Sequence, residues 1–164
     1  MNVSVVIPAL NEAGNIARLV EETYAAIPEQ QLKEVIVVDD GSDDATGDEI
    51  KALRSRYPTL RYLRHRTRCG QSASIRTGVL AANGPIIATM DGDGQNDPKD
   101  IPNLLDGLGA RMDDGPVMVG GVRTKRKAVG SRRLASVIAN WIRNAAFKDN
   151  CPDSGCGIKV YWRE

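Results

Sequence analysis

Hydrophobic and polar positions alternate between two patterns along the amino-terminal part of the chain. Two uninterrupted runs rich in β-branched residues predict buried strands of a parallel sheet over residues 2–10 and 34–40. Between them, apolar residues recur at helical spacing and predict a helix with Asn11 as its candidate N-cap. A strand, a helix and a second strand form a βαβ unit, which we expect to be right-handed. The apolar face of the predicted helix consists of Ile16, Leu19, Val20, Thr23 and Ile27.

The same alternation continues along the chain and predicts an α/β fold, with an open, mostly parallel sheet flanked by helices. With 164 residues, 41% of them hydrophobic, we expect a single domain over residues 1–164. The predicted helices cover residues 46–56, 72–82 and 98–111, and the predicted strands cover residues 60–65, 85–90 and 117–122. A last amphipathic helix is indicated by Leu134, Val137, Ile138, Trp141, Ile142 and Ala145.

The net charge of +1 hides an uneven distribution of charge. Residues 1–60 contain 5 Lys and Arg against 11 Asp and Glu, whereas residues 61–164 contain 17 against 10. The densest basic run, residues 123–133, holds six cationic residues and no acid. This run suits a phosphate-bearing partner or an anionic surface, and a solvated loop is the alternative interpretation.

The three cysteines, Cys69, Cys151 and Cys156, match no metal-binding spacing, and we interpret them as incidental. Met1 leads directly into the first strand pattern, and the odd number of cysteines favours the reducing cytoplasm. No apolar run approaches the ~18 residues that a membrane-spanning helix needs.

Acidic residues follow the predicted strand 85–90 in the segment DGDGQNDP. Asp91 and Asp93, on backbone kept open by glycine, can both reach one hard cation such as Mg²⁺ or Mn²⁺. A polar turn capped by aspartate is the alternative. The spacing excludes a helix-loop-helix calcium site, because Asn96 and Pro102 would occupy its glycine and glutamate positions.

A second acidic segment, VVDDGSDD, ends the predicted strand 34–40. Ligands of open α/β sheets bind at the carboxyl edge of the strands, where a carboxylate can accept hydrogen bonds from a nucleobase or ribose. We therefore predict that Asp39 and Asp40 face a pocket, while Ser42 or Asp43 caps the following helix.

The chain contains neither of the common phosphate-binding glycine loops. The turn after the first strand is PALNE, which excludes a G-x-G-x-x-G loop, and no Walker loop occurs. Phosphates therefore need another anchor, which a metal at the DGDG segment can supply. Gly70 and Gln71 open a helix whose free N–H groups could approach a phosphate, although an ordinary loop-to-helix junction has the same composition.

His65, the only histidine, has no nucleophile motif beside it, and we interpret it as structural.

Together these segments resemble family 2 glycosyltransferases of the GT-A fold, and among them the polyprenyl-phosphate sugar transferases of the dolichol-phosphate mannose synthase type. The resemblance extends over nearly the whole chain. It rests on the order of VVIPALNE, VVDDGSDD, the Gly70 segment, MDGDGQNDP, GGVR with a later RR pair, and DSGCGIK. In the last motif Cys156 and Lys159 replace residues that many relatives carry, which leaves the choice of acceptor open.

The resemblance implies a role for each motif. Asp91 and Asp93 would bind the metal and the donor diphosphate. The candidate catalytic residues are Asp93, Gln95, which would approach the donor sugar or the acceptor phosphate, and Arg123 and Arg132, which would grip the lipid phosphate with Arg133. The donor would be cradled by Pro8, Ala9, Asn11, Glu12 and Asp39, with further contacts from Asp40, Gly70 and Gln71.

The implied reaction is inverting: a phosphate oxygen of dolichyl or undecaprenyl phosphate attacks the anomeric carbon of a UDP- or GDP-linked sugar. Catalysis would rest on positioning and charge stabilisation. A non-lipid acceptor, a sugar nucleotidyltransferase, and a nucleotide-binding form without turnover are the alternatives. We expect a peripheral location on the cytoplasmic face of a membrane, no nucleic-acid partner, and a natural extension beyond Glu164.

Overall fold

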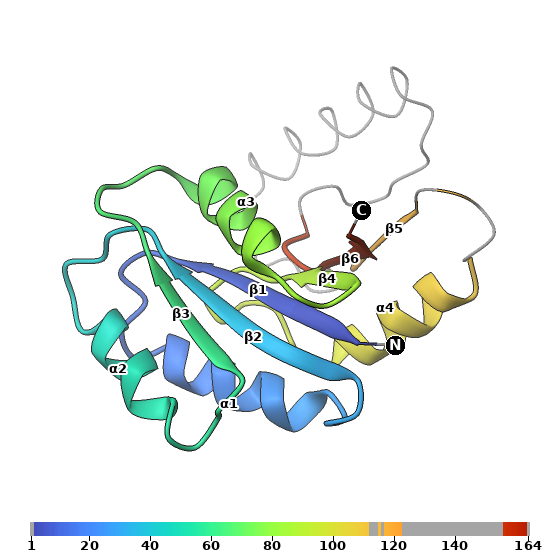
Figure 1. Cartoon of the computed structure of the whole chain (residues 1–164), viewed down its shortest axis with the longest axis horizontal. Helices are drawn as coiled ribbons and strands as arrows, with labels where there is room; N and C mark the ends of the chain where they lie inside the picture. Colours follow the sequence, from blue (N-terminus) through green and yellow to red (C-terminus); the bar gives the residue numbers. More distant parts are fainter. Residues whose placement is uncertain (1, 112–114, 116, 123–155, 164) are drawn as a thin grey trace, which may run out of the picture.

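The computed structural model describes residues 2–111, 115, 117–122 and 156–163, whose strands form one six-stranded sheet (Figure 1). The strands are β1 (Val3–Ala9), β2 (Leu32–Asp39), β3 (Leu60–Arg64), β4 (Ile86–Thr89), β5 (Met118–Gly120) and β6 (Lys159–Trp162). The helices are α1 (Ile16–Ala26), α2 (Thr46–Leu53), α3 (Gln71–Ala81) and α4 (Asp100–Gly109).

The strand order in the sheet is β3-β2-β1-β4-β6-β5. The first four strands pair in parallel, whereas β6 pairs antiparallel with both β4 and β5. Fully buried runs such as VSVVIPA of β1 are typical of parallel strands that are covered on both faces. The predicted open, mostly parallel α/β sheet is confirmed.

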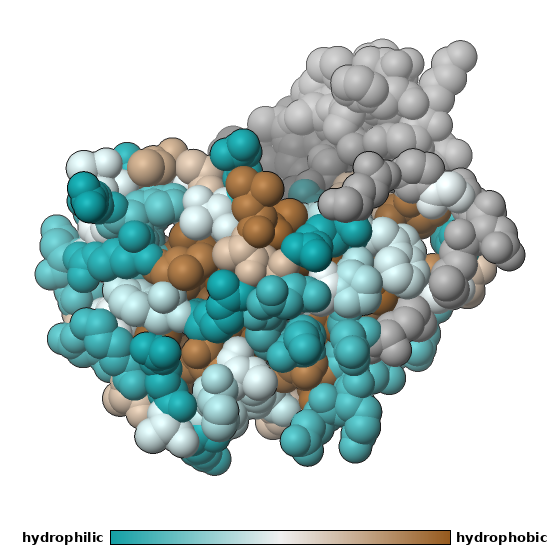
Figure 2. Space-filling model, in the orientation of Figure 1, coloured by the Kyte–Doolittle hydropathy of each residue, from teal (hydrophilic) through white to brown (hydrophobic). Residues whose placement is uncertain are grey.

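Helices cover both faces of the sheet, which gives three layers (Figure 1). Along β1, successive side chains point to opposite faces. Val5 and Ile7 join the larger core with residues of α1, α2 and α4, whereas Val6 joins a smaller core beneath α3. The outer surface seen in Figure 2 is mainly hydrophilic, with apolar patches between polar side chains.

The predicted elements over the first 111 residues are all present, with ends shifted by a few residues. The strand predicted over residues 117–122 is present as the short β5, while β6 was not predicted. The amphipathic helix predicted around residues 134–145 lies outside the described residues. None of the helices in the described ranges is long and apolar enough to cross a membrane.

The two predicted helix caps are wrong, because these side chains join two loops instead. Asn11 adopts a positive φ of 56°, its Oδ1 accepts the N–H of Asp43 at 3.0 Å, and its own N–H donates to Ser42 Oγ at 3.0 Å. Neither Ser42 nor Asp43 caps α2, whose first N–H, that of Thr46, donates to Asp44 Oδ1 at 3.0 Å. The loops after β1 and β2 are thereby fixed to each other.

Candidate functional site

A cavity of about 300 Å³ opens at the carboxyl ends of β1, β2 and β4. The chain adds β2 and β3 on one side of β1 and then returns to place β4 on the other side, so the strand order reverses beside β1. Such a reversal point is where open α/β sheets bind ligands. The cavity is lined by Pro8, Ala9, Leu10, Glu12, Asp40, Gly70, Gln71, Ser74, Asp91, Gly92 and Asp93.

Asp40 joins the end of β2 to the loop that precedes α3. Its Oδ1 accepts a hydrogen bond from the Cys69 N–H at 2.9 Å and contacts His65 Nδ1 at 2.7 Å, and its Oδ2 accepts the Gly70 N–H at 2.7 Å. Burial favours a higher pKa for this carboxyl group, but the hydrogen bonds from His65 and the two backbone N–H groups outweigh burial and lower the pKa. Asp40 is therefore an anionic group in the cavity wall at neutral pH.

Asp91 and Asp93, which follow β4, add two carboxylates to the cavity lining. Asp91 Oδ1 accepts a hydrogen bond from Gln71 Nε2 at 2.6 Å, and Asp93 Oδ1 accepts the Gln95 N–H at 3.0 Å. Between and after them the backbone turns sharply, with Gly94 at a φ of 69°. The carboxylate oxygens are the ligands that Mg²⁺ and Mn²⁺ prefer, so this donor set fits the predicted cation.

Asp39 lies behind the cavity and does not line it. Its side chain is fully buried, and it accepts hydrogen bonds from the Tyr62 hydroxyl at 2.6 Å and the Ser42 N–H at 2.7 Å. Burial opposes ionisation of Asp39, but these hydrogen bonds outweigh burial and lower its pKa, while burial and the bond to Asp39 raise the pKa of Tyr62 to about 12. Asp39 holds the loop that carries Asp40.

Two glycines outside the predicted set of site residues, Gly92 and Gly157, make close contacts beside the cavity. A Cβ on Gly92 would lie 2.6 Å from the carbonyl oxygen of Pro8, so only glycine lets the two loops approach this closely. A Cβ on Gly157 would overlap Asp91 Oδ2 and lie 2.8 Å from Asn96 Nδ2. Gly157 is the second glycine of the DSGCGIK segment, but its contact with Asp91 depends on the unpredicted strand β6.

The cavity brings together most of the predicted site residues. Asn11, Asp39 and Gln95 do not line it, and Arg123, Arg132 and Arg133 lie outside the described residues. Ser74, Leu10 and Gly92 line it without having been predicted. The predicted residues that line it are Pro8, Ala9, Glu12, Asp40, Gly70, Gln71, Asp91 and Asp93.

Comparison with known proteins decides the family. The sequence model of Glycosyl transferase family 2 matches residues 4–164. The chain belongs to glycosyl transferase family 2. The family assignment agrees with the resemblance found in the motifs, and it covers the acidic segments on both walls of the cavity.

Curated relatives of this family 2 chain include transferases that act on polyprenyl phosphates by name. The chain is 36% identical over 163 residues to the dodecaprenyl-phosphate galacturonate synthase of Rhizobium johnstonii, covering 98% of this chain and 48% of that protein. It is 35% identical to the undecaprenyl-phosphate 4-deoxy-4-formamido-L-arabinose transferase of Serratia proteamaculans, and the match covers 98% of this chain and 49% of that protein. The chain thus spans about half the length of these relatives.

Solved structures of glycosyltransferases share the fold of this family 2 chain. A mannosyltransferase from Pyrobaculum calidifontis in complex with GDP-Man and Mn²⁺ matches with a TM-score of 0.73 and 24% identity, covering 99% of this chain and 44% of that one. A second match is glucosyl-3-phosphoglycerate synthase from Mycobacterium tuberculosis in complex with Mn²⁺, UDP-Glc and phosphoglyceric acid. Its TM-score is 0.74 at 21% identity, and the match covers 99% of this chain and 56% of that one. The predicted GT-A fold is confirmed.

Proposed function

We propose that this chain carries the donor site of an enzyme that transfers a sugar from a UDP- or GDP-linked donor to a polyprenyl phosphate, with inversion at the anomeric carbon. The observation that carries the proposal is one cavity at the reversal point of the sheet, lined by Asp40 after β2 and by Asp91 and Asp93 after β4. The names of the curated relatives support a dodecaprenyl or undecaprenyl phosphate as the acceptor.

Asp91 and Asp93 are the proposed ligands of Mg²⁺ or Mn²⁺. Two structural neighbours are solved in complex with Mn²⁺ and a nucleotide-sugar, which supports a divalent cation as the cofactor. A cation held there would neutralise charge on the diphosphate of the nucleotide-sugar and so stabilise the nucleoside diphosphate as the leaving group. Gln71 holds one oxygen of Asp91 and, with Gly157 packed against the other, sets the direction of that carboxylate.

The nucleoside would lie against Pro8, Ala9 and Glu12, with Asp40 as the anionic acceptor for ribose or base N–H and O–H groups. Each Asp40 oxygen already accepts a backbone N–H, which holds the carboxylate in one orientation. Asn11 and Asp39 would support this wall from behind, through the bonds that tie the two loops together.

The acceptor phosphate monoester is already largely anionic near neutral pH, so its oxygen can attack without a strong general base. Gln95, and the arginines Arg123, Arg132 and Arg133, are proposed to orient that phosphate beside the anomeric carbon, because a guanidinium can hold two phosphate oxygens at once. The basic run 123–133 would also favour the anionic cytoplasmic surface of a membrane, where we expect the lipid acceptor to be bound.

The donor half of the proposal is tested by calorimetry with UDP and GDP, each with Mn²⁺ and with a chelator. One of the two nucleotides should bind in a Mn²⁺-dependent manner, and Asp91→Ala or Asp93→Ala should remove that dependence while the circular dichroism spectrum stays unchanged. Equal binding of both nucleotides in chelator would reject the assignment of Asp91 and Asp93 to the diphosphate.

The acceptor half is tested by transfer of a radiolabelled sugar to undecaprenyl phosphate in vesicles, with phosphoglyceric acid as the non-lipid comparison. Arg123→Ala and Arg132→Ala should sharply reduce transfer and leave nucleotide affinity nearly unchanged, whereas Lys125→Ala should have little effect. Transfer to phosphoglyceric acid alone would reject the lipid acceptor. Formation of nucleotide-sugar from a sugar 1-phosphate and a nucleoside triphosphate would instead identify a nucleotidyltransferase.

A further inference from the structure

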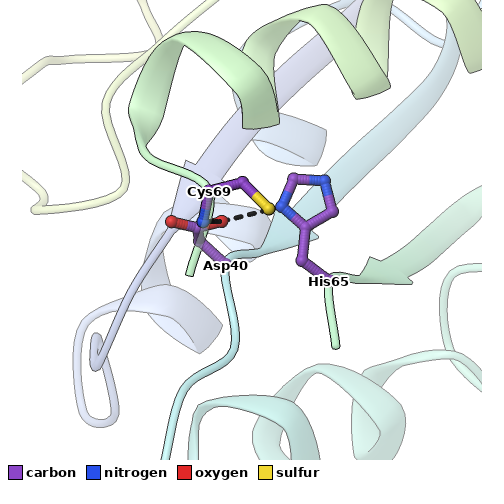
Figure 3. A group of neighbouring side chains, drawn as sticks. All are labelled: Asp40, His65 and Cys69. Carbon is purple, nitrogen blue, oxygen red and sulfur yellow. Dashed lines mark hydrogen bonds and ion pairs between the residues drawn. The ribbon is translucent and has the colours of Figure 1, made fainter. Parts of the chain in front are cut away.

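Three potential metal ligands of different chemistry meet beside the donor cavity, although their sequence spacing matches no metal motif. Asp40 follows β2, His65 follows β3, and Cys69 lies in the loop before α3. One carboxylate oxygen, one imidazole nitrogen and one thiol sulfur all lie within 4.8 Å of one another. Figure 3 shows the sulfur and the imidazole Nδ1 turned toward the same side of the Asp40 carboxylate.

We propose that Asp40, His65 and Cys69 form a second metal site that binds Zn²⁺. Thiolate, imidazole and carboxylate are the three ligand types that Zn²⁺ takes in proteins, usually in tetrahedral geometry. Mg²⁺ and Mn²⁺ prefer oxygen ligands, so the Asp91 and Asp93 carboxylates and this cluster select different ions. With three protein ligands, the fourth position is left for water or an incoming ligand.

The spacing of the three groups is close to what a tetrahedral zinc ion needs. Bond lengths of about 2.0 to 2.3 Å place ligand atoms about 3.3 to 3.6 Å apart. Asp40 Oδ1 and His65 Nδ1 lie 2.7 Å apart and would separate by roughly half an ångström. The Cys69 sulfur would give up its hydrogen bond to the Thr67 carbonyl, at 3.2 Å, and move inward.

Neighbouring groups already hold these ligands in place. His65 Nε2 lies 2.9 Å from the Thr77 hydroxyl on α3, and a ligating histidine typically has such a partner on its second nitrogen. Asp40 is fixed by the Cys69 and Gly70 N–H groups. Only 6% of the Asp40 side chain and 15% of the His65 side chain are exposed, while Cys69 is exposed and gives an ion access from solvent.

The position of the site links it to the donor cavity, because Asp40 and Gly70 both line that cavity. A Zn²⁺ ion would join the loop at Cys69 to the end of β2 and make this wall rigid. The proposal concerns binding alone and stands whether or not the chain transfers sugars, since its test requires no turnover.

The test is a titration of the reduced protein with Co²⁺, a spectroscopic substitute for Zn²⁺, in excess Mg²⁺ to occupy oxygen-only sites. We expect one Co²⁺ per chain with a thiolate-to-cobalt charge-transfer band, which stoichiometric Zn²⁺ removes. Cys69→Ser should abolish the band, and His65→Gln should weaken binding strongly. Cys156→Ala, which changes a buried thiol outside the cluster, should leave the band intact.

Thr77 provides a finer test of the same site. Thr77→Val removes the hydroxyl beside His65 Nε2 and should weaken Co²⁺ and Zn²⁺ binding by about tenfold, whereas Thr77→Ser should bind as the parent does. The proposal is overturned if the parent protein gives no charge-transfer band, or if the band survives in Cys69→Ser. Loss of the band in Cys156→Ala alone would also overturn it, by placing the ion elsewhere.

Discussion

At the scale of single residues, the absence of a side chain at Gly157 leaves room for the carboxylate of Asp91, the proposed metal ligand. Its Cα faces Asp91 Oδ2 and Asn96 Nδ2 so closely that even a methyl group would overlap the carboxylate. Asp91 is held from the other side by Gln71 at 2.6 Å, so it has little room to move away. Gly157 therefore acts as a positioning residue for the proposed metal ligand.

We predict that Gly157→Ala weakens Mn²⁺-dependent nucleotide binding by about tenfold or more, because the new methyl group reorients a metal ligand. Calorimetry with and without chelator measures the effect, and the chelator-resistant part of binding should not change. Gly120→Ala, on the neighbouring strand β5, is the matched control, since its Cβ would meet nothing closer than 3.9 Å. Unchanged affinity in Gly157→Ala would contradict the positioning role.

At the scale of elements, α3 connects the sheet to the cavity. Its amino-terminal residues Gly70, Gln71 and Ser74 line the cavity, while Gly78 lies against the sheet. A Cβ on Gly78 would overlap Val6 Cγ1 and lie 3.2 Å from Val38 Cγ2. Because Gly78 has no side chain, α3 can lie close to the sheet. This close packing fixes the position of the amino-terminal end of α3 beside the cavity.

Gly78→Ala should destabilise the protein by about 1 to 3 kcal/mol, because added volume in a tight contact forces the helix away from the sheet. Gly107→Ala in α4 is the control with the opposite expected sign. Its Cβ would lie 3.6 Å from Val119 Cγ1, an ordinary contact, and alanine favours the helix by up to about 1 kcal/mol. Urea unfolding monitored by circular dichroism measures both. Equal stability changes in the two variants would contradict the packing argument.

Some elements were predictable from local sequence and others were not. The strands β1, β2 and β4 are continuous apolar runs, so their existence followed from pattern alone. The cavity at their carboxyl ends lies where the pattern placed the candidate site. β6 is only four residues long, and although its Val, Tyr and Trp suit a strand, its partner β4 precedes it by some 70 residues, so no local pattern indicated the pairing. The helix caps were misplaced because the polar groups of the first loop are satisfied by the second loop, a contact that no spacing rule captures.

The same limit applies to the candidate site. Asp39 and Asp40 are adjacent and chemically equal in sequence, but the backbone at the end of β2 directs one inward to Tyr62 and the other to the cavity. The proposed zinc ligands lie on two loops, with Asp40 after β2 and His65 and Cys69 between β3 and α3. Neither residue spacing nor the single histidine could indicate that these loops meet.

At the scale of the whole molecule, the buried side chain of Glu34 connects several strands at the end of the sheet opposite the cavity. Glu34 accepts hydrogen bonds from the Ser4 hydroxyl, the Asn83 N–H and Arg61 at 2.6 to 2.8 Å. These bonds join β1, β2, β3 and the loop before β4. Burial opposes ionisation of Glu34, but the bonds from Arg61, Asn83 and Ser4 outweigh burial and lower its pKa.

Glu34→Gln should lower stability by about 1 to 3 kcal/mol at neutral pH, because the amide cannot accept all of these bonds. Since the folded-state pKa of Glu34 is lowered, its contribution is present above the ordinary pKa and is lost as the pH falls through the folded value. The parent protein should therefore lose more stability than Glu34→Gln on acidification below about pH 4.5. Thermal unfolding across pH measures this, and Glu22→Gln, on the surface, is the control expected to change stability by less than about 0.5 kcal/mol. Nucleotide affinity should be unaffected in both.

The placement of β6 between β4 and β5 has a consequence for how the chain folds during synthesis. Residues 159–162 complete the hydrogen bonding of β4, whose residues 86–89 leave the ribosome some 70 residues earlier. During that interval the ribosome-bound intermediate exposes an unpaired apolar strand edge, which is a template for association with other chains. Closing so long a loop is slow, because the entropy of the intervening chain is lost before the new contacts form. Until β6 has been synthesised, the open edge of β4 therefore remains available to strands of other chains.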